Sequence, residues 1–551
     1  GDVRVSQIEA LVAFAAVWAF GGPLLAAHRG RFSLWWREAF GPSDGGLALI
    51  GDCEVFDGFV DRTGKFVPWG GMMPQLFVSC SINAGPGEVF VPTIETTRLC
   101  FVSRTLLTRA SPVLLVGPPG NGKSALARAA LAALPEGAAT ARVSFHACTD
   151  APAFRAKLEA RLEARSSGHL GPRGSARLVC LVDDLHLCPA GRHGERPALS
   201  LLRALIDGYG WWDHRRRSQQ RVHGMAFCGA LSPAGGKRIC SKLQRRFAML
   251  SVPPVDGSGL AIFSALVGGY LGRGGFEAHV VAMAPMIGAA TIALHAEVGA
   301  AFVTSTTTPH YVWGLREICA VARSMCDAVA ELHGTRQRLA RFWLHEVSRV
   351  YSDRLATESD AAHFADIARR VTRAHFEELD QTELLRAPLL YGRLPPLPVR
   401  GELARSAASS IVSTELRRTA TRRRAKGADS LAAYVELRDT CRTRDRLEAW
   451  LDAFNARHTQ LRLVLFDEAA AHILRLCRIV QRGGGNLLLV STGGSGRTSL
   501  ARLAAFMAGL HLAEPGLSGC GSEEGEGADR EDQGRQNVEL EREGGGEEEG
   551  G

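Results

Sequence analysis

The sequence predicts an α/β fold in which a parallel sheet lies between two layers of helices, with helical subdomains attached. Two stretches support this prediction: SPVLLVGPPGNGKSALARAA from Ser111, and LLLVSTGGSGRTSLARLAAF from Leu487. Each reads as an apolar strand, a glycine-rich turn and a helix. A third stretch, ARLVCLVDDLHL at 176–187, is a continuous apolar run that ends in two acids. Such runs are typical of parallel strands covered on both faces.

Composition indicates several globular units followed by a tail. The chain has 551 residues, of which 46% are hydrophobic, and its net charge is +8. From residue 513 onward it is rich in glycine, glutamate and aspartate, so we expect a disordered acidic tail. The chain begins without methionine and enters an apolar helical pattern directly, which favours a fragment.

Two further stretches bear on possible partners. The basic cluster LRRTATRRRAKG at 416–427 lacks interleaved aromatic residues, which favours a solvated linker over a nucleic-acid site. The apolar stretch 280–303 is interrupted by Pro285, His295 and Glu297, which favours a buried helix over a membrane span. We therefore expect neither nucleic acid nor a membrane as a partner.

The first glycine-rich turn matches the phosphate-binding motif G-x-x-x-x-G-K-[ST] between a strand and a helix. In such a P-loop, backbone N–H groups surround the β-phosphate, the lysine reaches the β- and γ-oxygens, and the hydroxyl holds Mg²⁺. The sequence therefore predicts ATP or ADP with Mg²⁺ as cofactors. The candidate binding residues are Gly117, Pro118, Pro119, Gly120, Asn121, Gly122, Lys123 and Ser124, with Ser124 also a metal ligand.

Hydrolysis needs a metal-linked carboxylate and a group that orients water. Asp183 and Asp184 end the apolar run as a Walker B site requires. We assign Asp183 to the metal and Asp184 to the attacking water. Glutamate more often takes the second role, and aspartate is one methylene shorter.

Candidates for sensing and completing the site follow in the sequence. The strand MAFCGALSP ends near Ser232, a candidate sensor. In ring-forming ATPases, an arginine after this strand enters the neighbouring subunit's phosphate site, and we prefer Arg245 over Arg246 for this finger. Arg316, on the amphipathic stretch HYVWGLREICAVARS, is the candidate that returns to the γ-phosphate from a helical lid.

The order of these motifs resembles the dynein heavy chains, microtubule motors with six AAA+ modules in one polypeptide. The resemblance depends on FVPTIETTRL, LVDDLHL, LLRALIDGYGWWDHRRR, HYVWGLREI, RFWLHEVSRVYSDRL and the long stretch from Leu461 through the second P-loop. The VDDL and GWWD segments are similar to axonemal dyneins, which implies a place in the cytoplasm on the cytoskeleton of a ciliary or flagellar axoneme. The implied partners are the remaining AAA+ modules, other dynein chains, and microtubules through a stalk absent here.

The resemblance also implies a division of the chain. The expected units are 1–60, the lid of the second module; 61–84, a connector; 85–255, the large α/β subdomain of the third module; 256–400, its helical lid; 401–464, a basic linker with helices; 465–512, the start of the fourth module; and 513–551, the tail. The implied function is a regulatory, ATP-binding region of the motor. The isolated chain is expected to bind ATP with negligible hydrolysis, because Arg245 would act on the preceding module and the third module's finger would come from later in the fourth.

The sequence departs from the family at several positions. His186 stands where relatives usually have asparagine, and LSPAGGK replaces a glycine-proline run, so the sensor is an open question. In the second loop, Ser491 replaces the first glycine and Arg497 replaces the lysine. The wide, planar guanidinium of arginine is not equivalent to the compact ammonium of lysine. The candidate binding residues there are Gly493, Gly494, Gly496, Arg497 and Thr498, with the loop's catalytic competence left open.

Two alternatives use the same residues. A separate ring-forming AAA+ ATPase that remodels protein or nucleic acid would form rings of identical copies. A non-catalytic scaffold would bind nucleotide without turnover.

Overall fold

The computed structural model describes residues 2–40, 53–61, 63–72, 90–166, 168–213, 217–233, 239–253, 258–395, 434–481, 486–510 and 512–513. The expected acidic tail beyond residue 513 and the basic cluster 416–427 lie outside the described residues, as does part of the expected connector.

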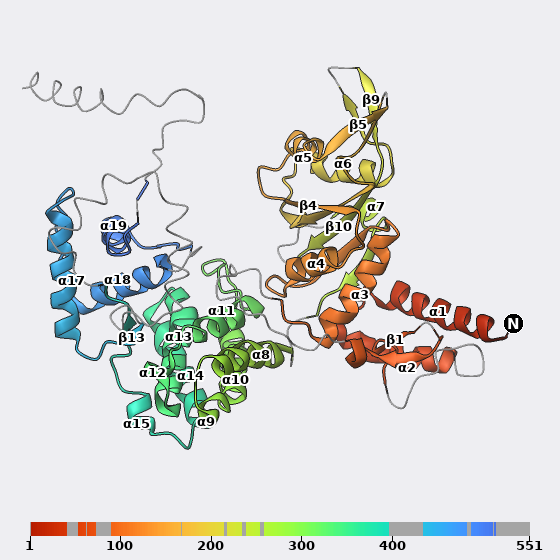
Figure 1. Ribbon diagram of the computed structural model, residues 1–551. Helices are drawn as coiled ribbons and strands as arrows, with labels where there is room; N and C mark the ends of the chain where they lie inside the picture. The colour runs from red at the N-terminus through yellow and green to blue at the C-terminus, as the bar shows by residue number, and fades with distance from the viewer. Residues whose placement is uncertain are drawn as a thin grey trace, which may run out of the picture.

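The centre of the fold is a five-stranded parallel sheet (Figure 1). Its order is β11 (Ala248–Ser251), β3 (Val113–Val116), β10 (Met225–Leu231), β7 (Arg177–Asp183) and β4 (Ala138–Ser144). All four neighbouring pairs are parallel. Because parallel strands end at the same edge, the P-loop after β3, the acids that end β7 and the polar end of β10 meet there.

Alternating side chains of the strands contact different helical layers. Val113 and Leu115 pack with α3 (Ile94–Thr108) and α4 (Lys123–Ala132), whereas Leu114 faces the core formed with α5 (Ala151–Glu159) and α6 (Pro197–Ile206). This period of two is what a strand buried on both faces requires. The predicted three-layer α/β architecture is confirmed.

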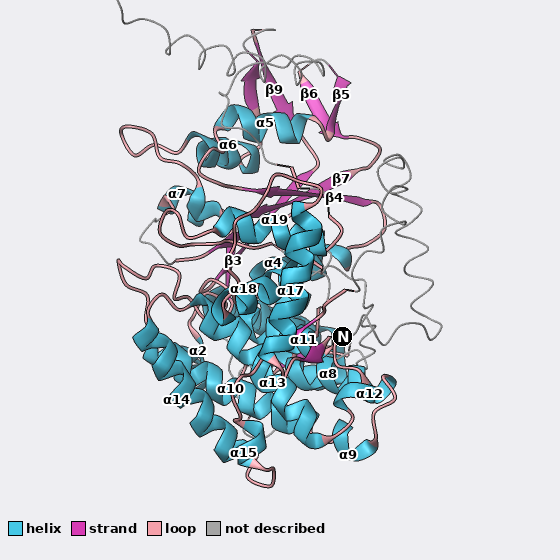
Figure 2. Cartoon of the chain, turned by 90° about the vertical axis from the view of Figure 1, so that its left-hand side faces the viewer, coloured by secondary structure: helices cyan, strands magenta, loops and turns pink. Residues whose placement is uncertain are grey.

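A second, four-stranded sheet is inserted beyond α5 and α6. Its order is β5 (Leu162–Ser166), β6 (His169–Pro172), β9 (Ser218–Val222) and β8 (Trp211–Asp213), and it lies at the end of the molecule opposite most of the helices (Figure 2). The stretch GYGWWDHRRR, part of the family resemblance, contributes β8.

The N-terminal helices pack against the same sheet unit. α1 (Asp2–Gly21) and α2 (Ala26–Ala39) are followed by the β1–β2 hairpin (Gly58–Val60 and Phe66–Pro68) and a short 3-10 turn at Trp69–Met72. Val17, Trp18 and Trp36 share one core with α3 and α4. The backbone N–H of Ser251 donates to the Gly22 carbonyl at 2.8 Å, which ties the α1–α2 turn to the edge strand β11.

A helical subdomain follows β11 and has a core of its own. Its helices are α8 (Ser258–Arg273), α9 (Ala278–Val281), α10 (Ala284–Ala301), α11 (Leu315–Met325), α12 (Ala330–His333), α13 (Arg336–Tyr351), α14 (Glu358–His375) and α15 (Gln381–Leu384). Among the described helices, only the stretch Ala278–Ala301 is long and apolar enough to cross a bilayer. In the structure, Ile287, Leu294 and Val298 on α10 pack into the subdomain core as in a buried helix of a globular protein.

The last described part is a smaller unit with a hydrophobic core of its own. The strands β12 (Tyr391–Gly392) and β13 (Val435–Glu436) pair, and α17 (Thr440–Asn455), α18 (Asp467–Val480) and α19 (Arg497–Met507) pack together. The predicted strand before the second glycine-rich loop is wrong for this structure: residues 486–490 have no strand pairing. A parallel strand needs hydrogen-bonding neighbours, and none of the described segments pairs with this one.

Candidate functional site

The first glycine-rich loop has the backbone geometry of a phosphate cradle. Gly120 and Gly122 have φ angles of 82° and 77°, in the left-handed region where residues with a Cβ are strained. Gly117 is required for a different reason: a Cβ there would lie 2.5 Å from the Val252 carbonyl oxygen. The side-chain amide of Asn121 donates to the Pro253 carbonyl at 2.9 Å, which fixes the loop to the chain after β11. The loop therefore leads into the N-terminus of α4, where free backbone N–H groups favour an anion.

Lys123 is held at the base of this loop. Its side chain is 9% exposed, and Nζ donates to the carbonyl oxygens of Gly117 at 2.9 Å and Pro118 at 2.6 Å. Burial lowers the pKa of Lys123, while the carboxylates of Asp184 and Asp183 act to raise it. A phosphate in the loop would compete for this ammonium and would compensate its charge more fully than two carbonyls can.

Ser124 and Asp183 form the candidate metal site. The Ser124 hydroxyl donates to Oδ1 of Asp183 at 2.9 Å, and Asp183 is 3% exposed. One hydroxyl and one carboxylate held together supply the oxygen ligands that Mg²⁺ takes beside a nucleotide. The residues present therefore fit a magnesium ion.

Arg142 is a contact that sequence reasoning missed. Its Nη2 lies 3.3 Å from Oδ2 of Asp183, although the arginine side chain is half exposed. The β4–β7 register, which pairs Ser144 with Asp183, places Arg142 near the carboxylate. No motif in the sequence marks this residue, because its position depends on which strand lies beside β7.

Asp184 has an unusual backbone and an altered carboxyl group. Its φ of 57° and ψ of 44° lie in the left-handed region, which turns the chain sharply after β7 into the 3-10 turn Leu185–Leu187. Burial, and next the Asp183 carboxylate, raises the pKa of Asp184. A carboxylate with a raised pKa is a stronger base, which suits a group that orients water.

The end of β10 contains an unsatisfied polar atom. The hydroxyl of Ser232 is buried and has no hydrogen-bond partner in the described structure, while its backbone N–H donates to Nδ1 of His186 at 3.4 Å. A buried hydroxyl without a partner is costly, so a ligand at this edge of the sheet would give it one. His186 thus contacts the residue proposed as the sensor.

The helical subdomain reaches the loop through two glycines. A Cβ on Gly314 would lie 3.4 Å from the Gly120 Cα, and the Leu315 side chain lies near Gly122. Glu317 accepts the Gly314 N–H at 2.9 Å and pairs with Arg354 at 2.6 Å, which fixes the start of α11. Sequence reasoning missed this contact, because nothing in the sequence relates the two glycines.

The two arginines proposed for phosphate contacts are both exposed. Arg316 follows directly after Leu315 of the loop contact, is exposed, and has no side-chain hydrogen bond or ion pair among the described residues. Arg245, at the end of α7 (Ser241–Gln244), is likewise exposed and unpaired within the described chain. Arg246 instead pairs with Asp207 at 2.9 Å. No described contact brings Arg245 to the Lys123 loop.

The second loop repeats the backbone of the first with different side chains. Gly494 and Gly496 have φ angles of 80° and 78°, close to those of Gly120 and Gly122, and α19 begins at Arg497 as α4 begins at Lys123. Gly493, Arg497 and Thr498 are exposed, and among the described residues no acid pairs with Thr498 as Asp183 pairs with Ser124. The Ser491 hydroxyl contacts that of Ser495.

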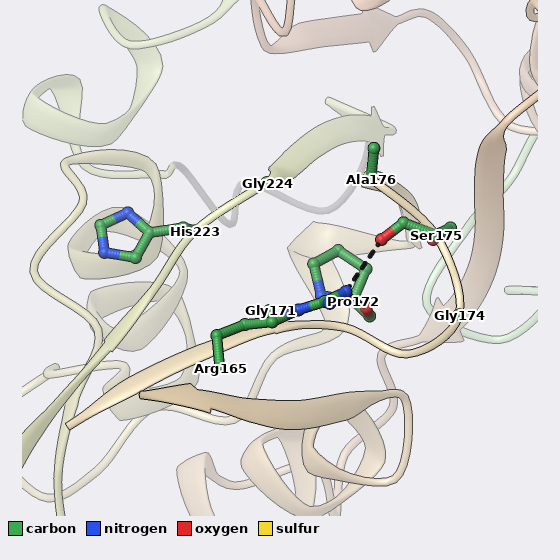
Figure 3. Close-up of a pocket in the computed structure, with 8 residues that line it drawn as sticks. All are labelled: Arg165, Gly171, Pro172, Gly174, Ser175, Ala176, His223 and Gly224. Atoms are coloured by element: carbon green, nitrogen blue, oxygen red, sulfur yellow. Dashed lines mark hydrogen bonds between the residues drawn. The ribbon is translucent and has the colours of Figure 1, made fainter. Parts of the chain in front are cut away.

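A hollow in the described structure lies away from this loop. It has a volume of about 540 Å³ and lies beside the inserted sheet, lined by Arg165, Gly171, Pro172, Gly174, Ser175, Ala176, His223 and Gly224 (Figure 3). The Arg165 guanidinium crosses it to the carbonyls of Pro172 and Ser175. None of the predicted site residues lines this hollow.

Comparisons with known proteins agree with the motif order. Four families match in succession: the dynein heavy chain AAA lid domain at 2–70, the P-loop containing dynein motor region at 80–255, the AAA+ lid domain at 286–386, and the P-loop containing dynein motor region D4 at 461–523.

Similar proteins include axonemal heavy chains from distant organisms. Dynein axonemal heavy chain 11 of Sus scrofa is 30% identical over 516 residues, which is 92% of this chain and 10% of the relative. Dynein axonemal heavy chain 17 of Homo sapiens is 29% identical over 92% of this chain and 11% of its own length. The dynein beta chain of the flagellar outer arm of Chlamydomonas reinhardtii is 29% identical over 92% of this chain and 10% of its own length.

The chain thus spans about a tenth of the length of these relatives. Its two P-loop regions imply nucleotide binding. Two lid families alternate with two P-loop families along one polypeptide, and both loops have matching glycine geometry. The chain belongs to the dynein heavy-chain family.

Proposed function

We propose that this chain is the ATP-binding regulatory region of an axonemal-type dynein heavy chain, and that the motor to which it belongs moves along microtubules in a cilium or flagellum. Similar proteins that are axonemal, ciliary and flagellar dynein chains support this assignment. The proposed partners are the other AAA+ modules of the heavy chain, other dynein chains and microtubules.

The proposed division follows the expected boundaries. Residues 1–60 form the lid of the second module, 85–255 and 256–400 form the third module and its lid, and 465–512 begin the fourth. The helical subdomain and the last described part each have a core of their own, and lid and P-loop family matches alternate along the chain, which supports this division.

One observation carries the proposal for nucleotide binding: the first loop combines left-handed glycines, a buried lysine and a hydroxyl–carboxylate pair at one edge of the sheet. Lys123 would contact the β- and γ-phosphates, and Ser124 with Asp183 would hold Mg²⁺, which would neutralise phosphate charge. Asp184 would accept a hydrogen bond from the attacking water. Arg316 would contact the γ-phosphate from the lid.

Arg245 would serve a different nucleotide. Because it is exposed, and no contact among the described residues pairs it or brings it to the Lys123 loop, it suits a finger that reaches the site of the preceding module. An exposed Arg245 equally suits a separate ATPase that assembles from identical copies. In that ATPase, Arg245 would complete the Lys123 site of another copy of this chain, whereas in a dynein heavy chain it would act on the preceding module.

The test of nucleotide binding is a titration of the chain with fluorescent ATP. We expect Lys123→Ala to weaken binding by about 10-fold or more, because a charge-assisted phosphate contact contributes roughly 1.5–3 kcal/mol. Lys157→Ala is the matched control, since Lys157 is exposed on α5, away from the loop. Equal affinity of the Lys123 variant and the parent would remove Lys123 from the site.

A further inference from the structure

A short 3-10 turn at Ser352–Arg354, directly after α13, holds the segment that leads into α11. Nη2 of Arg354 donates to the His310 carbonyl at 2.9 Å, and Nε2 of His310 donates to the Arg354 carbonyl at 2.9 Å. The Arg354 guanidinium also lies 4.8 Å from the centre of the Trp313 ring. These contacts place one arginine against the chain just before α11.

The same guanidinium fixes the first turn of α11. Nη1 of Arg354 lies 2.6 Å from Oε1 of Glu317, which is 8% exposed. The other carboxylate oxygen of Glu317 accepts the backbone N–H of Gly314 at 2.9 Å. A charge-assisted hydrogen bond is short and directional, so Arg354 holds the Glu317 side chain in the position from which it reaches Gly314.

Gly314 is the residue through which the lid meets the first phosphate loop. A Cβ on Gly314 would lie 3.4 Å from both the Gly120 Cα and the Pro119 carbonyl oxygen. Arg316, the lid residue proposed to contact the γ-phosphate, is two residues further along, in the first turn of α11. The position of the Arg316 guanidinium at the loop therefore depends on how firmly this turn is held.

The 3-10 turn is itself anchored on its other side. Asp353 pairs with Arg475 of α18 at 3.2 Å. Tyr351, at the end of α13, is fully buried, and its hydroxyl lies 2.9 Å from Nδ1 of His295 on α10. The Tyr351 ring lies 5.6 Å from the Trp313 ring. A side chain can position another residue only when its own backbone is fixed, and these contacts meet that condition for Arg354.

We propose that Arg354 is a positioning residue that sets Arg316 for the γ-phosphate and so raises the ATP selectivity of the first loop, which is the ratio of its ATP affinity to its ADP affinity. Arg354 acts through Glu317 and Gly314, since the contacts of its side chain among the described residues are with the start of α11 and the segment before it. ADP lacks the phosphate that Arg316 would contact, so a displaced first turn of α11 weakens ATP binding selectively. This inference rests on the proposed nucleotide site at Lys123.

The experiment measures the affinity of the whole chain for fluorescent ATP and for fluorescent ADP, both with Mg²⁺. We expect Arg354→Met to weaken ATP binding by about 10-fold, as for one lost charge-assisted contact, and to change ADP binding by less than about 2-fold. Arg316→Ala should give the same pattern. Arg370→Met is the matched control, because it removes an exposed ion pair to Glu297 within the same subdomain and should leave both affinities unchanged.

A double-mutant cycle separates positioning of Arg316 from a general structural effect. If Arg354 acts through Arg316, the chain with both Arg354→Met and Arg316→Ala should bind ATP at most about 2-fold more weakly than either single variant. Additive losses would overturn the proposal. An equal loss of ATP and ADP affinity in Arg354→Met, or an unchanged ATP selectivity, would also overturn it.

A further variant distinguishes positioning from charge alone. Without Arg354, the Glu317 carboxylate would be uncompensated and would repel ATP more than ADP, because ATP carries more negative charge. Adding Glu317→Ala to Arg354→Met removes this carboxylate together with the acceptor for the Gly314 N–H. We expect the ATP selectivity to stay lost in this double variant, because the first turn of α11 is still not held. Recovery of the selectivity would overturn the positioning role.

Hydrogen exchange checks that the lid of Arg354→Met remains folded. Without nucleotide, exchange should become faster in the first turn of α11 and stay unchanged in α14. If α14 also exchanges faster, Glu317→Ala alone takes the place of Arg354→Met in the titrations, and a retained ATP selectivity would overturn the proposal. Equal affinity of the parent and Lys123→Ala would refute the nucleotide site itself, whereas a parent that binds through Lys123 with no effect of Arg354→Met refutes only the positioning role.

Discussion

We expect the helical subdomain to lose stability in mild acid, because it buries two histidines. Burial lowers the pKa of His333 on α12 and of His345 on α13 to about 4 each. Nε2 of His345 is hydrogen-bonded to the Tyr434 hydroxyl at 2.8 Å, and Nδ1 of His333 accepts the N–H of Val329 at 3.1 Å. The folded subdomain therefore keeps both rings neutral.

The sign and size follow from proton linkage. An unfolded chain protonates histidine near its ordinary pKa of about 6.5, so the folded state is fully stable above that pH and loses stability as pH falls toward 4. At pH 5 each ring disfavours the folded state by about 2 kcal/mol, or about 4 kcal/mol together. Glu346, whose pKa the cations Arg478 and Arg349 lower to about 2 against the effect of burial, stabilises the fold above about pH 4.5 and loses this effect only in stronger acid.

The assay is hydrogen exchange of the peptide that covers α13, at pH 7.5 and pH 5.0, after correction for the intrinsic exchange rates. We expect the opening free energy to fall by several kcal/mol in the parent, and His345→Gln to remove about half of this fall. His363→Gln is the control, because His363 is exposed on α14. The same pH dependence in parent and His345→Gln chains would refute the reasoning.

Three other predictions concern the nucleotide sites. Asp184→Asn should keep nucleotide bound and abolish turnover in an intact heavy chain, whereas Asp183→Asn should also weaken the Mg²⁺ dependence of binding; turnover at the parent rate in the Asp184 variant would contradict this division. Gly117→Ser places at this position the serine that the second loop has as Ser491. It should lower the free energy of unfolding by about 1–3 kcal/mol, because the new Cβ would lie 2.5 Å from the carbonyl oxygen of residue 252. Gly299→Ser is the control and should leave the free energy of unfolding unchanged, because a Cβ at Gly299 has open space. ATPase activity of the isolated chain should be negligible at every protein concentration, since a finger contributes about 10³ to 10⁵ in rate; activity that rises with concentration and is lost in Arg245→Ala would favour the self-assembling ATPase.

The sequence predicted the sheet, the first P-loop and the acids that end β7, because each has a local pattern: an apolar run, a glycine spacing, a strand end. It did not predict Arg142 beside Asp183, or Gly314 against Gly120, because both contacts depend on which segments lie side by side. The preference for Arg245 over Arg246 stays a prediction, although the structure shows that only Arg246 is paired.

The strand expected before the second loop was wrong for a similar reason. The run LLLV has strand propensity, but a parallel strand becomes regular only when neighbours accept its hydrogen bonds. α19 needs no such neighbour, since its hydrogen bonds lie within the helix, and it formed where the sequence predicted.

The same stretch, residues 486–490, has a practical consequence for handling the chain. Leu488 and Val490 are 85% and 83% exposed, beside backbone groups that pair with no strand in the described part of the chain. Short apolar segments with free backbone donors and acceptors join edge to edge between copies and seed aggregates. Purified chain should therefore be kept dilute, and a charged residue in place of Leu488 should improve its solubility without touching either nucleotide loop.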